Sequence, residues 1–363
     1  SSLELEQTYA FKGYTKEKAN CITTANKLRS VLLDLSKTSV TQNTSIYACY
    51  VLQNVYDEHL NYKYLTFQPM VYTETNYLPE GVADNTQNIT NGVVMNLKSG
   101  VKLQGKVTLP TYTEDGLPIL SIGQSFRIAN DAAGGSSYGT EGACANVTHV
   151  FWYKEGKDKP CQLKTLGERA FSGTFYQKQD GSNIIGKLVY VELPESLRFI
   201  GDYAFASLQS LNIDKLVLPS NLKGIGVSAF SNAFDSQSRT STFKIPGSVS
   251  YIGLYAFSPI EAHIDKLQIG DSDAGSKLTY LGGKTSDWDF ITNPTYSSFY
   301  NGSNNIFNTW NNYYPASFEF YYTSDDQNTS FKYLVDHSDS GDNRIDILTY
   351  IKHISSISYV RGA

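Results

Sequence analysis

One pattern of apolar positions returns in register along the middle of the chain. Each clear copy begins with an apolar-x-apolar segment that ends in proline, and it closes with an Ala-Phe pair. Between them stand two single apolar positions, and glycine follows the second. The glycines of the three clear copies are Gly201, Gly226 and Gly253, so the steps are 25 and 27 residues. The positions of the first copy are Val191, Leu193, Pro194, Leu197, Ile200, Gly201, Ala204 and Phe205.

Weaker copies flank these three. Upstream, Gly167 and Gly123 follow the same apolar spacing, and only the copy around Gly167 keeps its Ala-Phe pair. Downstream, the copy that reaches Gly282 lacks both the proline and the Ala-Phe pair. Terminal copies of repeat proteins commonly drift in this way, and a period of roughly 20–29 residues is typical of leucine-rich repeats.

Each position of the repeat has a physical role in one coil of a solenoid. Alternation places Val191 and Leu193 on one face of a strand and Glu192 on the other. Proline lacks an N–H and ends the strand pairing, whereas glycine permits a positive φ or a close approach of the backbone. Alanine is small where coils meet, and phenylalanine fills the space between layers. About six apolar side chains per coil stabilise the fold only when adjacent coils cover both open ends.

The segments LPESLRFIGDYAF (193–205) and LPSNLKGIGVSAF (218–230) resemble the BspA-type leucine-rich repeat of bacterial surface and secreted proteins. The resemblance covers Val101 to Gly283 and is specific because the motif recurs in phase. It implies a right-handed solenoid, export from the cell and a role in adhesion or host interaction, and it implies no catalysis. Family members often carry a cysteine after Ala-Phe; only Cys144 occupies that slot, and Ser210 stands in it in the copy around Leu216.

Different kinds of sequence flank the repeats, which predicts three regions. In residues 1–62, apolar steps of three and four residues predict a first helix with Thr15 as its N-cap, and a second helix from Thr44 to Leu60. This pair either caps the first coil or docks a neighbouring domain. Residues 63–283 form the solenoid with a β-rich lead-in, and residues 284–363 form a β-rich cap or a small second domain. The predicted fold class is α+β, a right-handed leucine-rich-repeat solenoid with parallel strands on one face.

Composition and charge change this interpretation little. The chain has 30 Lys and Arg against 35 Asp and Glu, only 18% of its residues are charged, and 27 are tyrosine. No basic cluster occurs along the sequence, so a nucleic acid or other polyanion is not an expected partner. No apolar run reaches the length of a membrane span, so none is expected. The chain begins without a basic and apolar leader, which indicates that a signal segment was removed or precedes Ser1.

The four cysteines are too few for a disulfide scaffold. Cys144 fits the buried slot of the repeat and is expected to be a reduced core thiol. A bridge between Cys21 and Cys49 stays open as an alternative to two free thiols.

The sequence predicts no catalytic or metal site. Ser137 lies in a G-x-S-x-G match, but a Gly/Ser loop surrounds it instead of the strand and helix of a nucleophile elbow. Lys284 follows glycine as in a phosphate loop, but the first glycine of that motif is missing. The 5 histidines are scattered without zinc-ligand spacing, and Ile347 stands where a calcium loop needs glutamate. Neither an enzyme nor a cofactor is therefore expected.

Two surfaces are candidate binding sites. The middle residues of the apolar-x-apolar strands face outward and stack about 4.8 Å apart, either as a partner site or as a solvated face. They are Thr108, Phe151, Glu192, Val217, Lys244 and Gln268. The second candidate is an aromatic tract rich in Asn, whose rings suit the C–H faces of a sugar or the core of the cap. Its residues are Trp288, Tyr300, Trp310, Tyr313 and Tyr314.

The sequence thus predicts a non-enzymatic bacterial adhesion module, secreted or at the cell surface. It is expected to be a monomer that binds an extracellular protein or glycan through the repeat surface. Two alternatives stay open: a carbohydrate-binding or accessory domain of a larger secreted enzyme, and a structural spacer. Glycan binding that depends on Trp310 would separate the accessory domain from the adhesion module.

Overall fold

The computed structural model describes most of the repeat region and short parts of its flanks. The chain forms two compact units, residues 1–58 and 59–363, which are described separately. Within the described residues the helices are short 3-10 turns, so the helical part of the predicted α+β class is not seen there. The described residues are 8–16, 45–53, 59–78, 89–130, 139–156, 158–173, 178, 180, 182, 184, 186–253, 256–257, 262–278, 280–281, 317–322 and 356–361.

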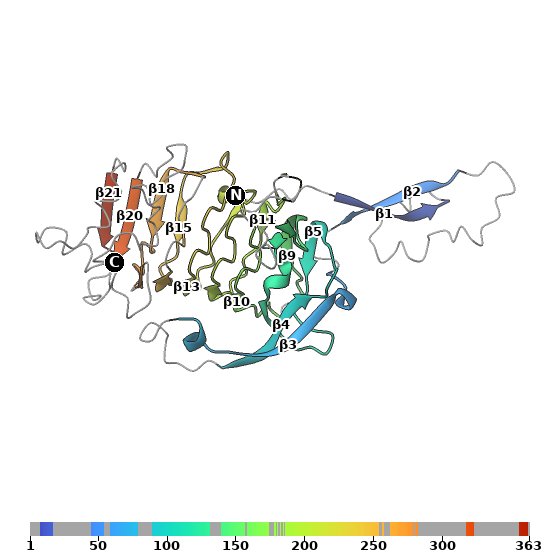
Figure 1. Ribbon diagram of the computed structural model, residues 1–363, viewed down its shortest axis with the longest axis horizontal. Helices are drawn as coiled ribbons and strands as arrows, with labels where there is room; N and C mark the ends of the chain where they lie inside the picture. Colours follow the sequence, from blue (N-terminus) through green and yellow to red (C-terminus); the bar gives the residue numbers. More distant parts are fainter. Residues whose placement is uncertain are drawn as a thin grey trace, which may run out of the picture. The chain divides into compact units, whose positions relative to one another are not determined.

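The first unit contains an antiparallel pair of strands where the second helix was predicted. Strand β1 spans Thr8–Thr15 and strand β2 spans Tyr47–Gln53 (Figure 1). The predicted helix from Thr44 to Leu60 is therefore wrong. The segment YACYVLQ is rich in aromatic and apolar residues that favour a strand once a partner strand is available. The first predicted helix lies outside the described residues except at Thr15, which ends β1.

The second unit begins with the predicted β-rich stretch. Strands β3 (Leu65–Tyr72) and β4 (Thr90–Leu97) pair antiparallel, and β5 (Gln104–Leu109) follows them. Two 3-10 helices, η2 (Tyr62–Tyr64) and η3 (Glu74–Asn76), stand before and after β3. These strands confirm the predicted lead-in to the repeats.

Parallel pairing of the repeats builds an eight-stranded sheet that the sequence pattern did not predict. Its order is β19-β16-β13-β12-β10-β6-β4-β3. Each repeat contributes the apolar position before its glycine, so that Leu166 pairs with Ile200 and Ile200 with Ile225. A strand of two residues is too short to show an alternating pattern. The sequence therefore predicted that the apolar residue before each glycine is buried, but not that it belongs to a strand. The repeat strands are β6 (Ile119–Ile122), β10 (Thr165–Leu166), β12 (Phe199–Ile200), β13 (Gly224–Ile225), β16 (Tyr251–Ile252) and β19 (Tyr280–Leu281).

The predicted apolar-x-apolar strands lie in two further parallel sheets, of order β11-β9-β5 and β15-β18-β20-β21. The segment Leu216–Leu218, between these sheets in the repeat order, is not a strand. It follows the 3-10 helix η5 (Ile213–Lys215), which the Asn212 side chain caps. The row is therefore interrupted by a local turn. The strands are β9 (Asn146–Trp152), β11 (Tyr190–Val191), β15 (Phe243–Ile245), β18 (Lys266–Ile269), β20 (Ser317–Tyr322) and β21 (Ser356–Arg361).

Two short pairs complete the described strands. Strands β7 (Ala129–Asn130) and β8 (Thr140–Glu141) pair antiparallel, whereas β14 (Arg239–Thr240) and β17 (His263–Ile264) pair parallel. The parallel pair belongs to the repeats because its residues come from successive coils.

Strands β20 and β21 continue the repeat sheet beyond the last recognisable motif. In parallel register, Phe318 pairs with Leu267 and Ile357 with Phe318. The predicted strand SFEFYY is confirmed by β20. The boundaries proposed between the helical region, the solenoid and the cap stay predictions.

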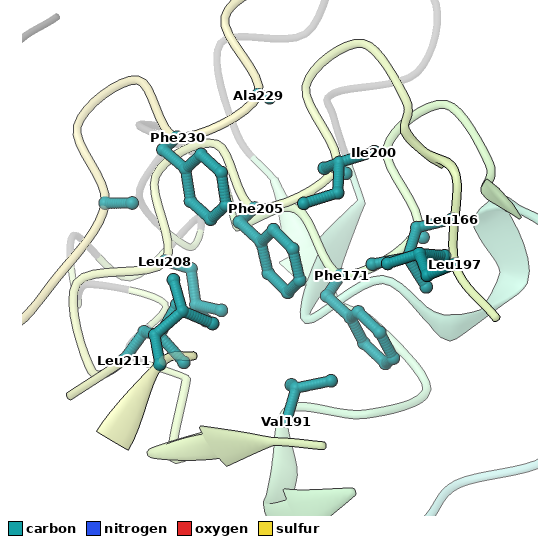
Figure 2. Packing of buried hydrophobic residues seen from close by; sticks show 14 of the residues in the cluster. Leu166, Phe171, Val191, Leu197, Ile200, Phe205, Leu208, Leu211, Ala229 and Phe230 are labelled. Atoms are coloured by element: carbon teal, nitrogen blue, oxygen red, sulfur yellow. The ribbon is translucent and has the colours of Figure 1, made fainter. Parts of the chain in front are cut away.

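The core of the repeats contains a column of phenylalanine rings. Each of Phe171, Phe205, Phe230 and Phe257 is at most 1% exposed. Their ring centroids follow one another at 5.8, 5.1 and 5.2 Å. Figure 2 shows the first three rings from successive coils, with the aliphatic side chain of Ile200 beside them. The predicted role of the Ala-Phe pair is confirmed, because the phenylalanines fill the space between layers.

The glycine of each repeat lets neighbouring coils approach. A Cβ at Gly201 would lie 2.5 Å from the Leu166 carbonyl oxygen, and one at Gly253 would lie 2.5 Å from the Val227 nitrogen. Of the two roles predicted for the repeat glycine, the structure shows the close approach of neighbouring backbones. Positive φ occurs instead two residues after the glycine, for example at Tyr203 (57°).

Cys144 is the predicted buried thiol, 1% exposed and free, and burial raises its pKa to about 12. Because the thiolate is the reactive form, we expect iodoacetamide at about pH 8 to leave Cys144 unmodified in the folded chain and to label it in urea. Peptide mapping by mass spectrometry measures this. Equal labelling of Cys144 with and without urea would contradict it. The candidate Cys21–Cys49 bridge lies outside the described side chains.

Candidate interaction surface

The predicted outward residues lie on successive coils, and we call them the outer row. Backbone pairing places Thr108 beside Phe151 and Lys244 beside Gln268. The row extends beyond the predicted residues to Glu319, which pairs with Gln268.

The turns that follow the middle residues of the outer row are hydrogen-bonded to one another from coil to coil. Ser220 donates its backbone N–H to Glu195 Oε2 at 3.1 Å, and Ser248 Oγ donates to the Ser220 carbonyl at 2.6 Å. These three residues belong to the proline turns that follow Glu192, Val217 and Lys244. The coil that carries Val217 therefore lies between the coils of Glu192 and Lys244.

The first two residues of the outer row are buried, contrary to the prediction. Phe151 is 1% exposed and Thr108 is 8% exposed. The ring of Phe151 lies 6.0 Å from that of His149, with 4° between the planes, and 5.5 Å from the ring of Tyr190. His149 shares a face of β9 with Phe151, and Tyr190 pairs with His149, so the three rings gather and withdraw apolar surface from water. The prediction that Thr108 and Phe151 are open to a partner is therefore wrong.

Glu192 is held by contacts within the fold. Its Oε2 accepts from the Trp152 backbone N–H at 3.2 Å, and its Oε1 lies 3.6 Å from Lys154 Nζ. The Trp152 indole also donates to the Glu192 carbonyl at 2.8 Å. The carboxylate joins two coils and is only partly exposed.

Val217 faces water, as the alternation predicted. Its side chain is 72% exposed, whereas Leu216 and Leu218 on either side are 6% exposed. A single exposed valine is ordinary on a protein surface. Its meaning therefore depends on the residues around it.

Paired charges follow Val217 along the outer row. Lys244 Nζ lies 2.6 Å from Asp271 Oδ1, and Lys266 Nζ lies 3.0 Å from Glu319 Oε2. Gln268 is half-buried and donates to the Gly270 carbonyl at 3.0 Å. Both ion pairs are partly exposed, so each stabilises the fold by only about 0–1 kcal/mol. The predicted outward position of Lys244 is confirmed.

A second charged group stands on the neighbouring strands β14 and β17. The Arg239 guanidinium lies 2.6 Å from Asp265 Oδ1, and His263 Nε2 lies 2.9 Å from the same oxygen. The hydrogen bond from Arg239, with a smaller contribution from His263, lowers the pKa of Asp265. Asp265 therefore stays ionised and carries a fixed negative charge between two basic groups.

The opposite side of the repeats carries a surface that the sequence did not reveal. Residues 72–78, which we call the strap, cross the outer face of the eight-stranded sheet. The ring of Tyr77 lies 5.4 Å from that of Tyr72 and 5.6 Å from that of Phe199. A Cβ at Gly224 would lie 2.7 Å from Leu78 Cδ2, so the missing side chain makes room for the strap. The sequence signal was the aromatic residue before two of the inner isoleucines, Phe199 before Ile200 and Tyr251 before Ile252, because an exposed strand would carry a polar residue there.

The remaining predicted site residues lie outside the described residues. This applies to Ser137 and to the whole aromatic tract from Trp288 to Tyr314. No cluster of three or more potential metal ligands occurs among the described residues. In the same part of the chain, no helix combines the length and the hydropathy needed to cross a membrane.

Comparison with known proteins identifies the repeat. Residues 160–275 match the model of the BspA type leucine rich repeat region, in six copies. The resemblance read from the motif is thereby confirmed. A comparison with curated proteins gives no match.

Several solved structures are similar to this chain. A leucine-rich repeat protein from T. pallidum has 20% identity and a TM-score of 0.36, over 58% of this chain and 71% of that one. One from Bacteroides ovatus has 20% identity and a TM-score of 0.33, over 62% and 46%. The pneumococcal vaccine antigen PcpA has 18% identity and a TM-score of 0.33, over 69% and 64%. The chain thus spans less than two thirds of the length of the latter two proteins.

Proposed function

Because residues 160–275 form a BspA-type leucine-rich repeat region, we propose that this chain is a non-enzymatic bacterial module that works outside the cell. In this proposal it binds an extracellular protein through the outer row and so supports adhesion. Solenoids of stacked repeats commonly use such an extended surface for binding. In this proposal the binding part of the row begins at Glu192, because Phe151 and Thr108 are buried.

The observation that carries the proposal is the exposed side chain of Val217 between coils that bear charged residues. Protein interfaces commonly have an apolar centre and a polar rim. Val217 would supply the apolar contact, whereas Lys244 and Glu319 would lie at the rim. Rim charges mainly affect the rate of association and the choice of partner.

The test is binding of the full chain to a panel of immobilised extracellular-matrix proteins. The double variant Val217→Asp, Lys244→Glu should weaken binding about tenfold or more, because it buries a charge in the apolar contact and reverses a rim charge. Biolayer interferometry gives the dissociation constants. Absence of binding to every protein of the panel would count against an adhesion role.

A matched control separates this site from a general effect of charge. Val71 is 53% exposed on β3, and Lys98 is exposed after β4. The double variant Val71→Asp, Lys98→Glu makes the same chemical changes away from the outer row. It should bind as the unmodified chain does, and an equal loss in both variants would refute the assignment of the surface.

A further inference from the structure

Three basic residues that are distant in the sequence lie on one corner of successive coils. Lys164, Arg198 and Lys223 each precede a strand of the eight-stranded sheet and are 34 and 25 residues apart. The backbone N–H of Arg198 donates to the Lys164 carbonyl at 2.8 Å, and that of Lys223 donates to the Arg198 carbonyl at 2.7 Å. Strands paired in this way are about 4.8 Å apart, so the three side chains start at that spacing. We call them the basic ladder.

Among the described residues, no carboxylate lies within ion-pair distance (4.0 Å) of the basic ladder. Several other lysines and arginines form ion pairs with Asp or Glu, but none of the ion pairs found in the described part of the chain involves these three residues. Arg198 Nη1 donates to the carbonyls of Glu195 and Leu197, which carry no net charge. All three side chains are partly exposed. Like charges on neighbouring strands destabilise a sheet, so the fold by itself gives no reason for the stack.

The surroundings of Lys164 show how close the charges are. Burial lowers its pKa, and the neighbouring Arg198 guanidinium lowers the pKa further. Glu74, at the start of η3, is the carboxylate that acts on this group from the strap, and its Oε2 is buried without a hydrogen bond. The ladder is therefore a positive strip beside one poorly solvated acid.

We propose that the basic ladder binds the sulfate or carboxylate groups of an anionic polysaccharide that runs along the stacked coils. Each of these three coils contributes one cation, so a chain with charged groups on successive sugar rings meets three cations in a row. Tyr77 is partly exposed and packs on Phe199, the residue after Arg198. Its ring offers the kind of apolar face that the C–H side of a sugar covers.

Other polyanions fit this spacing less well. Acidic side chains on one face of an extended peptide are about 6.6–6.8 Å apart. Phosphates along one strand of duplex DNA rise by about 3.4 Å per nucleotide along the helix axis. Both of these repeats lose register with coils that are about 4.8 Å apart.

The experiment measures binding of fluorescent dextran sulfate to the full chain by anisotropy, at low salt and at about 0.15 M salt. The triple variant Lys164→Gln, Arg198→Gln, Lys223→Gln should weaken binding about tenfold or more, because three ion pairs are lost. The control Lys98→Gln, Lys215→Gln, Lys277→Gln removes the same charge elsewhere and should change affinity less than about twofold. An equal loss in both variants, or no loss in the first, overturns the proposal.

Two further variants keep the test decisive if the triple variant unfolds. Lys164→Arg with Lys223→Arg keeps the charges and should keep the affinity. Glu74→Gln removes the opposing carboxylate and should strengthen binding about two- to fivefold. Unchanged or weaker binding of Glu74→Gln, with a normal melting curve, contradicts the ladder.

Comparator ligands decide the class of polyanion. Neutral dextran should not bind, and poly-L-glutamate and a single-stranded oligodeoxynucleotide should bind more weakly than dextran sulfate. Equal or tighter binding of either comparator overturns the assignment to a polysaccharide. This inference concerns a different face from the proposed protein-binding row. The Val217→Asp, Lys244→Glu variant should therefore keep its affinity for dextran sulfate, which makes failure of one proposal distinguishable from failure of the other.

Discussion

Replacing Phe205 with alanine is expected to lower the free energy of unfolding by about 3–5 kcal/mol. The ring is fully buried and lies between those of Phe171 and Phe230, at centroid distances of 5.8 and 5.1 Å. Its loss removes apolar burial and leaves a cavity between two coils, which the neighbouring backbone pairing prevents from closing. Urea titration of the full chain, followed by circular dichroism, measures the shift of the transition.

Two control variants show whether the loss of stability comes from the buried ring. Phe205→Leu keeps an apolar side chain in the column and should cost less than the alanine variant. Val217→Ala changes an exposed residue and should stay within about 0.5 kcal/mol of the unmodified chain. If Phe205→Ala shifted the transition no more than Val217→Ala, the phenylalanine column would not be the core of the repeats.

The second large effect is expected for Gly201→Ala, which should destabilise the fold by about 1–3 kcal/mol. The new Cβ would lie 2.5 Å from the Leu166 carbonyl oxygen and 2.8 Å from the carbonyl carbon of Gly167. These are backbone atoms of the preceding coil, so they cannot move aside as the end of a side chain can. The same urea titration measures the cost.

The control for this variant is a glycine in open space. Gly116 has φ +82°, and no atom lies within 4 Å of the place of its Cβ. Gly116→Asn should cost only a few tenths of a kcal/mol, since asparagine tolerates positive φ. A Gly201→Ala chain as stable as the Gly116→Asn chain would show that the coils are not held at this spacing.

The repeat motif predicted the interior well because each of its positions has one physical role. Leu197, Ile200 and Phe205 are fully buried, as the pattern required, and β20 spans the predicted strand SFEFYY. Val217 and Lys244 face outward for the same reason: side chains alternate along an extended chain. Local periodicity is enough for these statements, since neighbouring residues determine them.

Residues that depend on distant partners were not predictable in this way. Phe151 has the sequence position of an outward residue, yet the rings of His149 and Tyr190 cover it. The segment Tyr47–Gln53 has spacing compatible with a helix, but pairing with β1 makes it a strand. In both cases a contact across the chain overrides the local pattern.

The sequence by itself determined the leucine-rich repeat, its period and the buried leucines, isoleucines and phenylalanines, because these features recur at fixed spacing. Only the tertiary structure decided which residues meet on its faces. The eight-stranded sheet, the strap over Gly224 and the alignment of Lys164, Arg198 and Lys223 all arise from stacking of coils. Stacking brings together residues more than 20 positions apart, and no local pattern records such a contact.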